Sequence, residues 1–140
     1  MNTRTIGYWA TTGITAAGFL MGGVTDLVRG PEMVENMAHL GYPAYFLLIL
    51  GTWKVLGAAA IVAPKLARLK EWAYAGLVFD VTGASLSHAA SGDPAIRVIV
   101  PLLFLGLIVA SWSLRPESRR LPDAASAPLS ERGRTATQVA

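Results

Sequence analysis

Two charged side chains lie deep inside apolar segments of the chain, where an uncompensated charge is costly. Lys54 stands near the middle of the segment 44–63, and Asp80 stands near the middle of the segment 72–90. With a helical rise of about 1.5 Å per residue, both lie about 15 Å from the ends of their segments. At that depth in a membrane a charge costs about 2.5–3.5 kcal/mol, so such residues face the protein interior and find partners. The matched depths predict a direct Lys54–Asp80 ion pair.

The predicted pair has two interpretations, and the sequence leaves both open. The pair could form the floor of a pocket or part of a proton relay, or it could only hold two helices in register. Trp53, next to Lys54, lies too deep for the aromatic residues found at membrane surfaces. We therefore include Trp53 among the candidate pocket residues.

A second polar group gathers toward one end of the apolar segments. Asp26 and His88 each lie two residues before the end of a segment, and Glu32 and His39 follow in the connection after the first segment. Together they could line a cavity that opens outward above the predicted ion pair. His88 could instead hydrogen-bond a neighbouring helix. A bis-histidine haem is disfavoured because His39 lies on a surface segment, and no metal site is predicted because the spacing of a metal motif is missing.

The residue inventory excludes several chemistries. The chain has no cysteine, so it forms no disulfide, uses no catalytic thiolate and holds no cysteine-bound zinc or iron–sulfur cluster. It also lacks a phosphate-binding loop, a dinucleotide fingerprint and a metalloprotease helix motif. The sequence therefore identifies no catalytic residue and leaves open whether the protein is an enzyme.

The elements that must position these residues are four apolar segments, at residues 6–28, 44–63, 72–90 and 95–114. Each is close to the roughly 20 residues that a helix needs to cross a bilayer. Of the 140 residues 53% are hydrophobic and only 15% charged, against about 25% charged in soluble domains. The predicted fold is all-α, a four-helix transmembrane bundle in contact with the lipid bilayer.

Shorter signals refine this bundle. Apolar residues at 33, 34, 37 and 40 follow helical spacing, which predicts a short amphipathic interfacial helix between spans one and two. Asp93 and Pro94 predict an N-terminal cap and first position for the last helix. Gly18 and Gly22 form a GxxxG pattern, which predicts a helix contact face and could support a homodimer.

The basic residues predict an orientation. Nine of them lie before the first span, between spans two and three, or after the last span, and only two lie in the other connections. By the positive-inside rule both termini are cytoplasmic, in a multi-pass protein of the inner (plasma) membrane. Tyr8, Trp9, Trp72, Tyr74 and Trp112 are expected to form an aromatic belt on that side. Residues 116–140 are predicted to be a disordered basic cytoplasmic tail, which binds no nucleic acid because it lacks aromatic residues and a folded scaffold.

Several short stretches, spread over about residues 6–115, form a recognisable combination: Tyr8-Trp9, Gly22-Gly23-Val24-Thr25-Asp26, His39-Leu40-Gly41-Tyr42-Pro43, Leu50-Gly51-Thr52-Trp53-Lys54-Val55-Leu56-Gly57-Ala58, Leu69-Lys70-Glu71-Trp72-Ala73-Tyr74-Ala75-Gly76, Phe79-Asp80, and Ser87-His88 followed by Gly92-Asp93. In this combination the sequence resembles the DoxX-like family of small four-span bacterial membrane proteins. The resemblance sets the membrane domain at 1–115. Founding members of that family are linked to a thiosulfate:quinone oxidoreductase, in which the DoxX-type chain is a membrane subunit.

Three functions remain open at this stage. The resemblance implies a membrane subunit of an oxidoreductase or a small-molecule-binding protein in a redox pathway, with a redox partner subunit. Its ligand would be a quinone or another amphipathic molecule in the outer polar cavity. Alternatively, Lys54 and Asp80 could serve a small transporter or proton-coupled permease element. The third possibility is a non-catalytic scaffold for a membrane complex.

Overall fold

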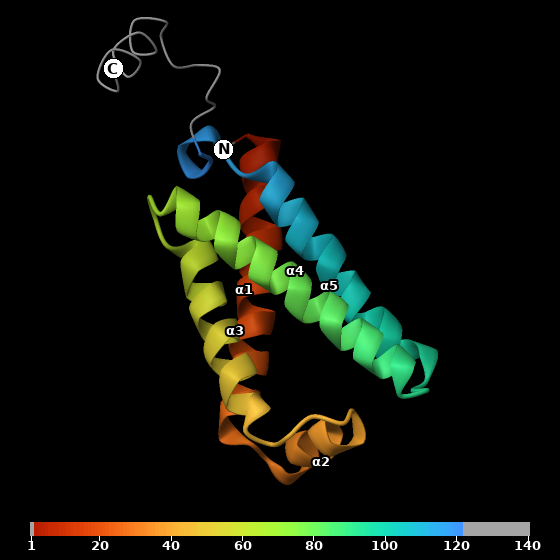
Figure 1. Ribbon diagram of the computed structural model, residues 1–140. Helices are drawn as coiled ribbons and strands as arrows, with labels where there is room; N and C mark the ends of the chain where they lie inside the picture. The colour runs from red at the N-terminus through yellow and green to blue at the C-terminus, as the bar shows by residue number, and fades with distance from the viewer. Residues whose placement is uncertain (1, 122–140) are drawn as a thin grey trace, which may run out of the picture.

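The computed structural model describes residues 2–121, and within them the chain is all-helical (Figure 1). A single-turn 3₁₀ helix, η1, follows the last of five α-helices. The elements are α1 (Thr3–Val28), α2 (Pro31–His39), α3 (Phe46–Val62), α4 (Ala67–Ala90), α5 (Ala95–Leu114) and η1 (Glu117–Arg119). The predicted short helix between the first two long helices is therefore present as α2. The predicted tail from residue 122 onward lies outside the described residues.

The four long helices run alternately up and down. Helix α1 packs against α3 and α5, and α4 packs against α5 and α3. Figure 1 shows the N-terminus, the α3–α4 connection and η1 at one end, which we call the inner end. Helix α2 and the α4–α5 connection lie at the opposite, outer end (Figure 1). Because four long helices alternate in direction, the first and last described residues lie at the same end of the bundle.

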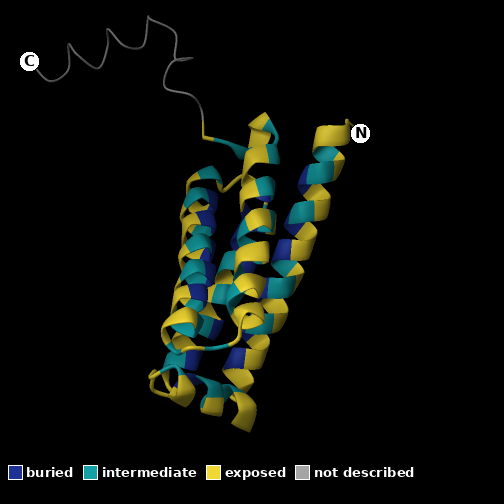
Figure 2. Cartoon of the chain, turned by 90° about the vertical axis from the view of Figure 1, so that its right-hand side faces the viewer, coloured by how far each residue is buried: buried dark blue, intermediate teal, exposed yellow. Residues whose placement is uncertain are grey.

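The buried core is small, and the outward faces of the helices are apolar. The core cluster lies where the long helices meet and consists of Phe19, Ala58, Ile61, Tyr74, Leu77, Val81 and Ile108. Many large hydrophobic side chains are exposed instead, among them Met21, Trp72 and Phe79, which are 71%, 79% and 74% exposed. Figure 2 shows exposed positions along the outer side of every helix. Patches of this extent are unusual on monomeric soluble proteins.

Only one helix among residues 2–121, α5, is both long and apolar enough to cross a membrane by itself. Helix α3 is apolar but has 17 residues. Helix α4 carries Arg68, Lys70, Glu71 and Asp80, which lower its mean hydropathy. The structure thus confirms the all-helical architecture, whereas the prediction of four spans is not confirmed.

The backbones of α1 and α3 approach each other closely at Gly23 and Gly51. A Cβ atom added at Gly51 would lie 2.7 Å from the carbonyl oxygen of Gly23, and one added at Gly23 would lie 2.9 Å from that of Gly51. The predicted contact face at Gly18 and Gly22 is only half right. Gly18 packs against the ring of Phe104, whereas a Cβ at Gly22 would meet no atom of the described chain within 4 Å.

Basic side chains cluster at the inner end of the bundle, and this cluster was not predicted from the sequence. Lys70 is fully buried, and its ammonium group donates to the carbonyl oxygens of Ala60 (2.8 Å) and Ile61 (3.1 Å). These carbonyls lie in the last turn of α3, where helical partners are missing. Arg119 of η1 donates to the Tyr8 hydroxyl (3.2 Å). Residue 119, which the sequence placed in the tail, therefore contacts the bundle.

This crowding of like charges affects Lys70, which precedes the apolar segment 72–90. Burial, followed by the nearby guanidinium groups of Arg119 and Arg115, lowers the pKa of Lys70 from 10.5 to about 8. Tyr8 and Tyr74, expected in an aromatic belt, are instead buried in this region. Their hydroxyl groups hydrogen-bond inside the protein, which a surface belt does not require.

Candidate functional site

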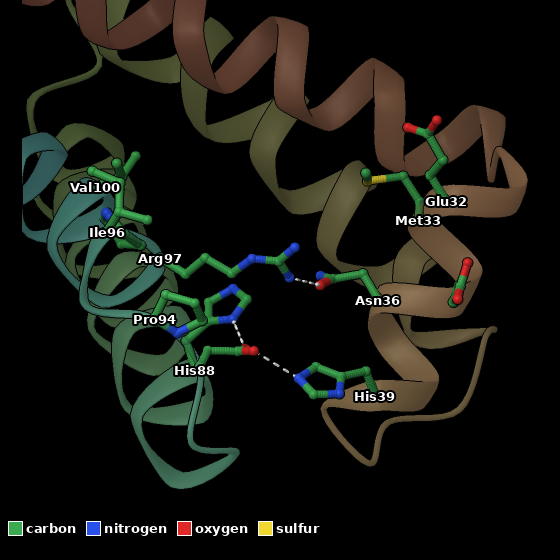
Figure 3. Close-up of a pocket in the computed structure, with 12 residues that line it drawn as sticks. Glu32, Met33, Asn36, His39, His88, Pro94, Ile96, Arg97 and Val100 are labelled. Atoms are coloured by element: carbon green, nitrogen blue, oxygen red, sulfur yellow. Dashed lines mark hydrogen bonds and ion pairs between the residues drawn. The ribbon is translucent and has the colours of Figure 1, made fainter.

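A cavity of about 900 Å³ lies at the outer end, between α2 and the α4–α5 hairpin (Figure 3). Helix α2 forms one wall and the beginning of α5 forms the other, and His88 comes from the end of α4. The lining residues are Glu32, Met33, Glu35, Asn36, His39, His88, Asp93, Pro94, Ile96, Arg97, Val100 and Pro101. Three of the predicted site residues, Glu32, His39 and His88, therefore share one cavity, as expected.

Asp93 joins the two histidines of this cavity. Its Oδ1 lies 2.8 Å from Nε2 of His39, and its Oδ2 lies 2.6 Å from Nδ1 of His88 (Figure 3). The carboxylate accepts both hydrogen bonds and thereby connects α2 to the end of α4. The hydrogen bond from His88 is the main cause that lowers the pKa of Asp93, and it outweighs the opposing effect of desolvation.

The role predicted for Asp93 was wrong. Helix α5 begins at Ala95, its N-cap is Pro94, and no side chain caps its first turn. Asp93 turns toward the histidines because the Gly92 turn, with φ of +71°, folds it back beside the last turn of α4. Its five-residue separation from His88, across a helix end, is the signal that could have identified this contact.

Both walls of the outer cavity carry polar and apolar side chains. Arg97 of α5 reaches across the cavity, and its Nη1 lies 3.4 Å from Oδ1 of Asn36 (Figure 3). Met33, Ile96, Val100 and Pro101 supply an apolar surface beside these polar groups. The cavity thus offers a hydrogen-bond donor, two imidazoles and an apolar face to a molecule that combines polar and apolar parts.

Lys54 is bound by two carboxylates rather than one. Its Nζ lies 2.8 Å from Oδ2 of Asp26 and 3.9 Å from Oδ2 of Asp80. The predicted contact with Asp80 is present, but Asp26 is the closer partner. Asp26 is buried and belongs to this deeper cluster, not to the outer cavity where the sequence placed it. The two glycines allow this pairing, because Asp26 lies against Gly51 and Lys54 lies against Gly23: an added Cβ would lie 3.1 Å and 3.0 Å from their respective Cβ atoms.

A second cavity of about 750 Å³ lies along α3 and α4, and we call it the α3–α4 groove. Trp53, Lys54 and Asp80 line one part of this groove, and most of its other lining residues are apolar. The sequence predicted one cavity with the ion pair as its floor. The structure instead has two separate cavities. Lys54 and Asp80 line the α3–α4 groove and do not line the outer cavity.

Two further residues of the outer cavity, Asn36 and Arg97, were not identified as site residues from the sequence. Arg97 entered that reasoning only as a charge that sets orientation. Among residues 2–121 there is no group of three or more His, Cys, Asp or Glu side chains arranged to hold a metal ion.

Helical architecture with apolar outward faces and polar groups directed inward is the pattern of integral membrane proteins. The chain matches the DoxX-like family over residues 10–111 and belongs to that family. Membership indicates a membrane protein, in agreement with the exposed apolar surface.

One relative is the "Uncharacterized protein YdgD" of Bacillus subtilis (strain 168). The two chains are 36% identical over 70 residues, which are half of this chain and 60% of that protein. The match thus spans less than two thirds of the relative. No solved structure matches this chain significantly.

Proposed function

We propose that the protein crosses the membrane four times, through α1, α3, α4 and α5, with both termini in the cytoplasm. The exposed apolar side chains on all four long helices support this proposal, because only lipid would cover them without cost. The span of α4 begins at Trp72, so that Lys70 lies at the inner surface. A reporter fused to the C-terminus should show cytoplasmic activity, and a periplasmic signal there would overturn the topology.

We further propose that the outer cavity binds a small amphipathic molecule of the quinone type. The observation that carries this proposal is the presence of both polar and apolar side chains in the lining of one cavity. A quinone carbonyl accepts hydrogen bonds, which the Arg97 guanidinium can donate. Its flat apolar ring fits beside Met33, Ile96 and Val100. In a redox pathway such a protein would deliver or hold the quinone for a partner subunit, which should then copurify with it.

Calorimetric titration of the purified protein with menadione and with a short-chain ubiquinone tests this assignment. Loss of a hydrogen bond to a charged group costs about 1.5–3 kcal/mol, which corresponds to at least about tenfold in affinity. Arg97→Ala should therefore weaken binding by that factor. Arg68→Ala removes an exposed arginine at the inner end and should leave the affinity unchanged. Equal binding by both variants, or no binding by the native protein, would refute the proposal.

A second candidate function rests on the Lys54 cluster. A partly buried ammonium group shared by two carboxylates can exchange partners when one carboxylate gains a proton. Such an exchange is what a proton-coupled permease element requires. Proton flux into liposomes, followed with an internal pH-sensitive dye, should be abolished by Asp80→Asn. Native protein that conducts no protons under an imposed gradient would exclude this function.

A further inference from the structure

The buried cluster around Lys54 carries an excess negative charge. Asp26 and Asp80 both contact the single ammonium group of Lys54, at 2.8 Å and 3.9 Å. Within residues 2–121 no other basic side chain lies within 4 Å of either carboxylate. Two negative charges thus share one positive charge, and the ionised cluster has a net charge of −1. An unbalanced charge in an apolar environment requires a counter-charge or a proton.

The excess charge faces the α3–α4 groove. Asp80 lines the groove, whereas Asp26, the carboxylate closer to the ammonium group, does not. Asp80 is therefore both the less completely neutralised partner and the one that a molecule in the groove can reach. Its side chain is 19% exposed, which leaves part of the carboxylate free for an additional contact.

Aromatic side chains line the same groove as Asp80. Trp53 of α3 and Phe79 of α4 line the groove and are 68% and 74% exposed, and Trp72 lines it further toward the inner end. The remaining lining is mostly small or aliphatic, from residues such as Gly57 and Leu77. Aromatic faces attract cations, and an apolar lining accepts hydrophobic bodies. Both properties occur beside the unbalanced carboxylate.

We propose that the α3–α4 groove binds a lipophilic organic cation, with the positive charge beside Asp80 and the hydrophobic body against Trp53 and Phe79. The volume of about 750 Å³ lies within the range of small-molecule sites. A lipid anion or a free fatty acid would place a third negative charge in the cluster. A neutral chain would leave the charge unbalanced. The proposal concerns a different cavity from the quinone assignment and holds whether or not the protein transports the cation.

Tetraphenylphosphonium is a suitable probe, because it is a permanent, bulky and hydrophobic monocation. We expect it to bind the full-length protein in detergent and to quench tryptophan fluorescence. Triphenylphosphine oxide, a neutral analogue of similar shape, should bind at least about tenfold more weakly. If the cation and the neutral analogue bind equally well, the groove recognises only hydrophobic surface and the proposal fails.

The Asp80→Asn variant keeps the size of the side chain and removes its charge. We expect it to weaken binding of the cation by at least about tenfold and to leave binding of the neutral analogue nearly unchanged. Glu117→Gln makes the same chemical change on the exposed η1 helix and serves as the control. Unchanged cation affinity in Asp80→Asn would overturn the assignment of the charge.

A measurement on the native protein covers the case in which the variant does not fold. Dicyclohexylcarbodiimide modifies protonated carboxyl groups in apolar surroundings, and mass spectrometry locates the modified residue. The reagent should label Asp80, and tetraphenylphosphonium should prevent this labelling. Labelling of Asp80 that the cation does not reduce would contradict the proposal. The quinone assignment is tested separately, because Arg97→Ala lies outside the groove and should not change the affinity for tetraphenylphosphonium.

Discussion

The Lys54 cluster gives the sharpest test of the structure, because its two carboxylates lie at different distances. At an effective dielectric constant near 20, the attraction of Lys54 is about 6 kcal/mol at the 2.8 Å distance to Asp26 and about 4 kcal/mol at the 3.9 Å distance to Asp80, before desolvation. Lys54→Met leaves the buried Asp26 and the partly buried Asp80 without their shared ammonium group, which should cost about 3–5 kcal/mol. Asp26→Asn should cost less, since Lys54 retains Asp80. Asp80→Asn should cost least, because Lys54 then keeps Asp26, its closer partner.

Two double-mutant cycles measured by unfolding in one detergent separate these contributions. The coupling energy between Lys54 and Asp26 should exceed that between Lys54 and Asp80. The double variant Lys54→Met with Asp26→Asn should cost less than the sum of the two single losses. Glu117→Gln again controls for loss of an exposed carboxylate. A larger coupling with Asp80, or no coupling in either cycle, would show that the observed distances do not describe the folded protein.

Three further predictions concern packing and pH. Gly51→Ala should destabilise the fold by about 1–3 kcal/mol in thermal unfolding, because its Cβ would press on a backbone oxygen of α1, whereas Gly22→Ala should be neutral or stabilising. The lowered pKa of Asp93 means that the bonds of its ionised carboxylate with His88 and His39 stabilise the fold at pH values above the ordinary aspartate pKa of about 3.9. This stabilisation is lost as the pH falls through the lowered pKa. Unfolding of Asp93→Asn should therefore depend less on acid pH. Because the pKa of Lys70 is about 8 in the folded state, Lys70 binds fewer protons in the folded than in the unfolded state between pH 8 and 10.5. The free energy of unfolding should therefore rise across that interval. In Lys70→Met this rise should be absent.

The sequence predicted the helices well because their signals are local. Apolar segments, flanking glycine and proline residues and the amphipathic spacing at 33–40 place the elements within a few residues of α1 to α5. Helix α4 begins five residues earlier than the apolar segment 72–90, since Ala67 to Glu71 are good helix formers that hydropathy does not register. The family resemblance read from the short stretches is confirmed by the match over residues 10–111.

The pairing of side chains could not be predicted as well, because it depends on rotation and tilt. Counting residues gives the depth of Lys54 and Asp80 but not the direction in which each helix face points. The Gly23–Gly51 contact fixes which faces of α1 and α3 meet. In this arrangement Asp26 lies closer to Lys54 than Asp80 does. Gly23 and Gly51 lie on different helices, so no fixed spacing in the sequence reveals that they meet. The GxxxG pattern of Gly18 and Gly22 has a fixed spacing within one helix and was therefore noticed instead.

Both cavities follow from the way in which the connections constrain the helices. The connection between α3 and α4 is four residues long, which keeps these helices together at the inner end, where Lys70 binds the last turn of α3. Figure 1 shows α4 inclined away from α3 toward the outer end. There α2 and the α4–α5 hairpin meet through polar contacts, among them the bond between His39 and Asp93 and that between Asn36 and Arg97. None of the described residues of the apolar core lines the outer cavity. The cavity therefore lies beyond the packed core, where polar contacts connect the helices.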